Sequence, residues 1–419
     1  MSGEHGERRR TTLLVDPTTH RAMTEWLECI SCAAHYDALS VRYTCDACGS
    51  LLSVERSTIL DRNAFDDRRS SWAPIDQSGV WRFREGVLNL DRVITHPEGG
   101  TRLYEREGLF FKHEGENPTG SFKDRGMTVA VTQAVRVNAT AVACASTGNT
   151  SASLAAYAAQ AKLPAIVFVP AGKVSSGKLA QTLAYGAKCL QVRGDFDAAM
   201  RLVREACDKL GIYLVNSINP FRIEGQKTII WELLQDLYWE APDWIVVPAG
   251  NLGNTSAFGK ALREAFVQGW IDKVPRLASI QAHGANPFFR GYLDAFNERH
   301  RISAETIASA IRIGDPVSWD RAVAAIAVTN GVVEEVSDDE IMSAKRAIDA
   351  MGIGCEPASA ATLAGVRKLR EAGVMKDGEK IVCVLTGHIL KDSEANFRSE
   401  NVMEIDASVD EVERVLAKG

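Results

Sequence analysis

Short apolar segments alternate with longer segments of helical periodicity between residues 139 and 385, and this alternation restricts the possible folds more than any other feature of the sequence. Strands are predicted at residues 139–145, 165–169, 188–192, 244–248 and 379–385. Helices are predicted at residues 150–162, 176–186, 196–209, 255–266 and 358–371. Apolar strands separated by helices are typical of parallel sheets covered on both faces, so the chain is predicted to be an α/β protein.

Three polar, glycine-containing loops follow predicted strands, at residues 146–151, 250–254 and 386–388. Ligands of parallel sheets bind at the carboxyl ends of strands, which is where these loops lie. Hydroxyl and backbone N–H groups at a helix start bind carboxylates or phosphates, and glycines let the backbone approach an anion closely. Plain helix capping and an ordinary strand-to-helix turn are the alternatives. The loops therefore predict an anion site without a nucleotide-binding motif.

Lys123 lies between Phe122 and a glycine-containing turn at a predicted helix start. Most lysines are solvated surface residues. A site beside an aromatic ring and a helix N-terminus disfavours the ammonium charge, and the resulting low pKa suits a lysine that forms a Schiff base.

The composition bounds the possible partners. With 419 residues the chain is expected to form two or three domains, and its net charge of −6 argues against a nucleic-acid or anionic-membrane partner. The longest uncharged stretch, residues 137–161, is too rich in Ser, Thr and Asn to span a membrane. A cytoplasmic location is expected.

Four of the nine cysteines form the pattern C-x2-C-x12-C-x2-C, at Cys29, Cys32, Cys45 and Cys48. Paired CxxC motifs in a cytosolic protein indicate metal ligands, and four thiolates can close a tetrahedral structural zinc site. Four reduced thiols in a segment that has lost its metal are the alternative. The surrounding residues 26–95 are predicted to form short irregular pieces.

The segment HEGENPTGSFKDRG, residues 113–126, resembles the Schiff-base lysine segment of threonine synthases. Further segments resemble motifs of the same family in the same order, namely ASTGNTSAS (145–153), VNSINPFRIEGQK (215–227), PAGNLGNTSA (248–257), AIRIGDPVSW (310–319), CEPASAATLAG (355–365) and VLTGHILKD (384–392). Seven ordered motifs make the resemblance specific, and they span about two thirds of the chain.

This resemblance implies a pyridoxal-phosphate (PLP) enzyme of fold type II, similar to the tryptophan synthase β subunit. Two αβα domains with parallel sheets would follow a small N-terminal extension that carries the four cysteines. The implied bounds are 1–95 for the extension, 96–135 with 223–419 for the large PLP-binding domain, and 136–222 for the small domain. A homodimer is also implied.

The resemblance assigns roles to residues around the cofactor. Lys123 would carry PLP as a Schiff base and move substrate protons, and Asn149 would hydrogen-bond the ring hydroxyl. Thr386 would face the pyridine nitrogen, where a hydroxyl does not enforce protonation as a carboxylate would. The cofactor phosphate would be held by Gly250, Asn251, Leu252, Gly253 and Asn254.

The resemblance also assigns residues to the substrate, a phosphorylated amino acid. The carboxylate or phosphate would be bound by Ser146, Thr147 and Thr150, and the substrate phosphate by Asn216, Ser217 and Arg222. A guanidinium suits bidentate phosphate binding, although an ordinary ion pair is the alternative for Arg222.

The implied reaction converts O-phospho-L-homoserine and water into L-threonine and phosphate. A relative of different specificity is the main alternative: a specialised-metabolism paralogue, a cysteate-synthase-like β-replacement enzyme or a serine/threonine dehydratase. Ile389 replaces a glycine of the family's TGHGLKD motif and keeps that alternative open. A degenerate PLP fold acting as a sensor, or a zinc-ribbon nucleic-acid binder, would instead lack turnover.

Overall fold

The computed structural model describes residues 25–90, 92–146, 148–171, 176–193, 202–203, 205–207, 209–396 and 402–416. Thr147 and much of the helix predicted at 196–209 lie outside the described residues. Among the helices of the described part, none is long and apolar enough to cross a lipid bilayer.

A six-stranded sheet forms the centre of the fold, in the order β12-β11-β10-β13-β5-β4, and only the β4–β5 pair is antiparallel. Its strands are β4 (Leu103–Arg106), β5 (Leu109–His113), β10 (Trp244–Pro248), β11 (Arg276–Ala282), β12 (Val332–Val336) and β13 (Ile381–Leu385). The order places β13 between β10 and β5, so segments far apart in the sequence become neighbours.

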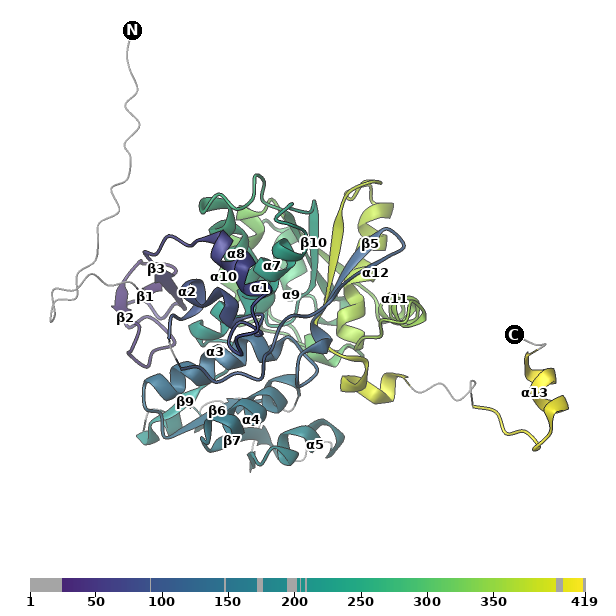
Figure 1. The fold of residues 1–419 in the computed structure, drawn as a ribbon, viewed down its shortest axis with the longest axis horizontal. Helices are drawn as coiled ribbons and strands as arrows, with labels where there is room; N and C mark the ends of the chain where they lie inside the picture. The colour runs from purple at the N-terminus through teal and green to yellow at the C-terminus, as the bar shows by residue number, and fades with distance from the viewer. Residues whose placement is uncertain are drawn as a thin grey trace, which may run out of the picture.

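Successive strand residues point to opposite sides of this sheet. Because the residues on both sides are apolar, helices cover both faces. On β10, Ile245 and Val247 pack with α7 (Pro220–Asp236), α8 (Gly253–Val267) and α10 (Trp319–Val328). The alternate residues Trp244 and Val246 pack on the other face. The helices of that face are α11 (Asp338–Ala350) and α12 (Pro357–Glu371), and Figure 1 shows the two groups on either side of β10.

A second, four-stranded sheet is fully parallel and has the order β8-β7-β6-β9. Its strands are β6 (Ala141–Ala145), β7 (Ala165–Pro170), β8 (Lys188–Val192) and β9 (Ile212–Leu214). The helices α3 (Lys123–Arg136) and α4 (Asn149–Ala161) share a hydrophobic core with this sheet, and α5 (Ser176–Ala184) follows β7. The predicted α/β architecture is confirmed, while the division into domains stays a prediction.

The N-terminal region is more regular than the predicted irregular pieces. The strands β1 (Glu25–Cys29), β2 (His35–Asp37) and β3 (Leu52–Arg56) form an antiparallel sheet in the order β2-β1-β3. Ion pairs join this sheet to two helices. Arg56 pairs with Glu224 of α7, and Glu25 pairs with Arg136 of α3. The other α-helices of the described residues are α1 (Arg62–Arg69), α2 (Arg84–Val87), α9 (Pro287–Leu293) and α13 (Val409–Leu416).

Candidate active site

A cavity of about 430 Å³ lies where the N-termini of α3, α4 and α8 meet the segments after β6, β10 and β13. The predicted site residues that line it are Lys123, Ser146, Asn149, Thr150, Ser217, Arg222, Gly250, Asn251, Leu252, Gly253, Asn254 and Thr386. The carboxyl ends of parallel strands from both sheets thus contribute to one cavity. This is the place where open α/β sheets bind ligands.

Lys123 is the first residue of α3, and its Nζ lies 4.2 Å from the centroid of the Phe122 ring. The pKa of Lys123 is lowered to about 7, chiefly by burial. The positive charge of the nearby Arg222 also lowers this pKa, and its effect is larger than the opposing effect of Glu356. Among the described residues no carboxylate forms an ion pair with Lys123. The predicted low pKa has the expected physical cause, which is loss of water around the ammonium group.

The loop after β10 is shaped to approach a ligand with its backbone. Leu252 adopts a left-handed conformation with φ of 63° immediately before α8. A Cβ at Gly250 would lie 3.0 Å from Cα of Ile311, so this position has little room for a side chain. The Asn254 carboxamide is oriented by the Gln226 Nε2, which donates to its Oδ1 at 2.7 Å. The loop is therefore a cradle for an anionic group at the start of α8.

Arg222 is a buried cation on α7, with 2% of its surface exposed. Its Nη1 donates to the carbonyl of Val215 at 3.1 Å, and within the described part of the chain its Nε has no partner. Burial lowers the pKa of Arg222 to about 10. A buried guanidinium that lines a cavity and has no carboxylate partner among the described residues fits an anionic ligand better than a structural ion pair.

Asn216 does not line the cavity, unlike the neighbouring Ser217 and Arg222. Its Oδ1 accepts the backbone N–H of Ala145 at 3.0 Å, and its Nδ2 donates to the Ala145 carbonyl at 3.3 Å. The carboxamide thus replaces a neighbouring strand's peptide group at the end of β6. These two hydrogen bonds hold the Asn216 carboxamide against the loop that begins at Ser146, and the phosphate contact of Asn216 stays a prediction.

Several charged and amide residues line the cavity that the sequence did not single out, namely Gln181, Gln226, Arg312, Glu356 and Lys391. The last three fall inside the quoted motifs around residues 310–319, 355–365 and 384–392, so a charged residue within a motif was the available signal. Lys391 Nζ donates to Gln181 Oε1 at 2.6 Å and thereby joins the segment after β13 to α5. Glu356 is a buried carboxyl with 4% exposure.

Ile389 lies beside the cavity and not on its lining, although the next two residues, Leu390 and Lys391, do line it. Its side chain faces the α-carbon of Gly354, where a Cβ would come within 3.3 Å of Ile389 Cδ1. The branched residue therefore occupies space over a glycine that has a φ of 73°.

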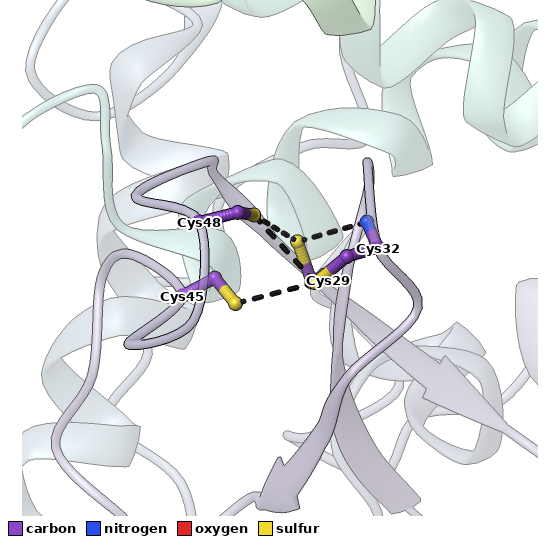
Figure 2. A group of neighbouring side chains, drawn as sticks. All are labelled: Cys29, Cys32, Cys45 and Cys48. Carbon is purple, nitrogen blue, oxygen red and sulfur yellow. Dashed lines mark hydrogen bonds between the residues drawn. The ribbon is translucent and has the colours of Figure 1, made fainter.

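The four N-terminal cysteines meet in one cluster, as Figure 2 shows. The sulfurs of Cys29 and Cys48 are 3.4 Å apart, and those of Cys32 and Cys45 are 3.6 Å apart. A zinc–sulfur distance of about 2.3 Å separates the sulfurs of a tetrahedral site by about 3.8 Å. All four sulfurs lie within 4.8 Å of one another, so the donor set fits a tetrahedral metal ion.

The comparisons with known proteins show the family of this chain. The family model described as "Pyridoxal-phosphate dependent enzyme" matches residues 94–387, which defines the chain as an enzyme of that class. The chain is 45% identical over 408 residues to a threonine synthase of Methanocaldococcus jannaschii, covering 93% of this chain and 98% of the relative. A threonine synthase of Methanosarcina acetivorans is 44% identical over 406 residues, with the same coverage of both chains. This chain belongs to the threonine synthase family.

A solved structure of threonine synthase from Escherichia coli has the same fold, with a TM-score of 0.67 and 18% sequence identity. The similarity covers 93% of this chain and 94% of that chain. The fold-type II architecture predicted from the motifs is confirmed.

Proposed function

We propose that this enzyme converts O-phospho-L-homoserine and water into L-threonine and phosphate, with PLP bound at Lys123. The observation that carries the proposal is a cavity that brings together a lysine of low pKa and a buried arginine without a carboxylate partner among the described residues, in a member of the threonine synthase family. A volume of about 430 Å³ is within the range of small-ligand sites.

The cavity residues fit PLP. The cradle at residues 250–254 would hold its phosphate, Asn149 its ring hydroxyl and Thr386 its ring nitrogen, while Lys123 would hold it covalently. When bound, PLP supplies an electron sink for carbanion chemistry at the substrate. Lys123 is suited to moving protons near neutral pH because its pKa is about 7.

The substrate's two anionic ends would lie at different parts of the cavity. Ser146, Thr150 and the N-terminus of α4 would bind the carboxylate. Arg222 and Ser217 would bind the phosphate. Lys123 Nζ would remove protons from Cα and Cβ and return protons to Cγ and Cα, while phosphate leaves Cγ and water adds at Cβ.

The test is to incubate PLP-loaded protein with O-phospho-L-homoserine and to measure phosphate and threonine together. Equal amounts of both products support the proposal. Phosphate release without threonine, or turnover only of unphosphorylated serine or threonine, would support the β-replacement or dehydratase alternatives instead.

The low pKa of Lys123 predicts how the apoprotein captures its cofactor. Only the neutral amine attaches PLP, so the rate of attachment should rise with pH and reach half its maximum near pH 7. An ordinary lysine would reach it near pH 10.4. The visible absorption that accompanies attachment, recorded in a series of buffers, measures this rate. A half-maximum above about pH 9 would contradict the predicted environment of Lys123.

Replacing Ile389 with glycine, the family's residue, should leave the substrate preference unchanged. The side chain lies over Gly354 and outside the cavity lining, so kcat/KM for O-phospho-L-homoserine should change by less than about threefold. Steady-state kinetics with this substrate and with O-phospho-L-serine measure the preference. A reversal of preference in Ile389→Gly would show that residue 389 controls specificity.

We also propose a structural zinc ion bound by Cys29, Cys32, Cys45 and Cys48. Zinc that binds only the folded site stabilises the protein, by about 2.7 kcal/mol when it is present at 100 times its Kd. Removing it with a chelator, or replacing Cys32 with serine, should release one zinc per chain and lower the Tm by several degrees. Metal analysis and thermal unfolding test this, with Cys189→Ser as the control, because Cys189 lies on β8 outside the cluster. Purified protein without zinc and with an unchanged Tm after chelation would refute the site.

The homodimer and the cytoplasmic location stay predictions. The domain bounds 96–135 with 223–419 and 136–222 stay predictions as well, supported by the confinement of the four-stranded sheet to residues 141–214.

A further inference from the structure

Glu356 connects two of the residues proposed to hold the PLP ring. Its Oε2 accepts a hydrogen bond from Asn149 Nδ2 at 3.1 Å, and its Oε1 accepts one from Thr386 Oγ1 at 3.3 Å. Thr386 is also hydrogen-bonded to Ser359, with the two hydroxyl oxygens 3.0 Å apart. A buried carboxyl thus stands directly behind the hydroxyl that is proposed to face the ring nitrogen.

The local structure directs this carboxyl to Thr386. Glu356 is the N-cap residue of α12, yet its side chain makes no capping hydrogen bond. A Cβ at Gly387 would lie 2.3 Å from the Glu356 carboxyl carbon, so only glycine at that position leaves room for the carboxyl group. The backbone N–H of Glu356 donates to the Gly387 carbonyl at 3.1 Å and holds the two segments together.

The charged groups that face Glu356 do not neutralise it by contact. Lys123 on α3 and Lys391 after β13 act on it from a distance, and Asp392 opposes them. Among the described residues no cation forms an ion pair with Glu356. Burial, as the largest cause, raises the pKa of Glu356 above that of an ordinary glutamate, so its carboxyl retains a proton to higher pH.

The single proton of the Thr386 hydroxyl makes the hydrogen bonds directional. When Glu356 is a carboxylate, it accepts the hydrogen bond that the Thr386 hydroxyl donates, and Thr386 offers only lone pairs to the ring nitrogen, which favours a protonated nitrogen. When Glu356 is a neutral acid, it donates to Thr386, and Thr386 can donate to an unprotonated nitrogen. Both arrangements contain the same number of protons. The shared proton lies on the ring nitrogen in the first arrangement and on Glu356 in the second.

We propose that Glu356 is a positioning residue that sets the protonation of the PLP ring nitrogen through Thr386. A hydroxyl at the ring nitrogen would otherwise leave this nitrogen unprotonated and the electron sink moderate. The Glu356–Thr386 pair makes a proton available to it. This inference rests on the proposed cofactor site and adds a residue that the family motifs alone did not assign.

The experiment measures the ring nitrogen directly in the full-length protein loaded with PLP that is ¹⁵N-labelled in the ring. Its ¹⁵N chemical shift is recorded from pH 5 to 9 in the wild type and in Glu356→Gln, which keeps the shape of the side chain and cannot ionise. Glu371→Gln is the matched control, because it makes the same change at the exposed, opposite end of α12. Circular dichroism establishes that each variant is folded.

The wild type and Glu371→Gln are expected to give the same curve of ¹⁵N chemical shift against pH. In Glu356→Gln the chemical shift is expected to lie closer to the value of an unprotonated ring nitrogen over part of this pH range. Gly387→Ala, whose new Cβ would displace the carboxyl, is expected to move the shift in the same direction. Identical shifts in wild type and a folded Glu356→Gln or Gly387→Ala at every pH would overturn the inference. If the wild type attaches no PLP, or attaches it equally after Lys123→Ala, the proposed cofactor site itself fails.

Discussion

Replacing Lys123 with alanine is expected to remove the visible absorption band of the PLP-loaded enzyme and to lower kcat by about 10³-fold or more. The side chain combines two functions, covalent attachment of the cofactor and proton transfer, and proton transfer alone contributes about 10²- to 10⁴-fold. Its pKa of about 7 depends on burial and on Arg222, so no solvated lysine can replace it.

The matched control is Lys376→Ala, which removes an exposed lysine outside the cavity lining. This variant should keep both the absorption band and the turnover of the wild type. Absorption spectra and phosphate-release kinetics on the three proteins provide the measurement. A Lys123→Ala protein that retains the band, or turns over at a tenth of the wild-type rate, would show that another residue holds the cofactor.

Replacing Arg222 with methionine is expected to lower kcat/KM for O-phospho-L-homoserine by about 10²- to 10⁴-fold. A hydrogen bond to a charged group contributes about 1.5–3 kcal/mol, and a guanidinium can make two to one phosphate. Methionine keeps much of the apolar contact of the arginine stem, so the fold and the cofactor band should persist. Because the Arg222 charge also lowers the pKa of Lys123, the half-maximum for PLP attachment should move to higher pH in this variant.

Arg346→Met on the exposed surface of α11 provides the control and should behave as the wild type. Phosphate release at several substrate concentrations separates kcat from KM. An unchanged kcat/KM in Arg222→Met would show that Arg222 does not bind the substrate phosphate. It would also favour the view that Arg222 serves only to close the end of β9 through Val215.

The sequence determined the local features of this protein, because these depend on neighbouring residues. The predicted strands at 188–192 and 244–248 coincide with β8 and β10, and the helices predicted to begin at residues 150 and 358 each begin one residue earlier. The loops at 146–151, 250–254 and 386–388 could be predicted as an anion site because glycines and helix N-termini have the same chemistry in any fold. The spacing of the cysteines likewise predicted that their four sulfurs lie together, and they do so in the structure.

Only the tertiary structure decided which distant segments meet. The parallel pairing of β13 with both β10 and β5 could not be inferred locally, since it depends on how the helices pack against the whole sheet. The same packing turns Glu356 away from its helix end and toward Thr386, and it directs the Asn216 carboxamide to the end of β6 instead of the cavity. Residue type indicates what chemistry a side chain can perform, but its partners, burial and pKa are fixed by contacts between segments that lie far apart in the chain.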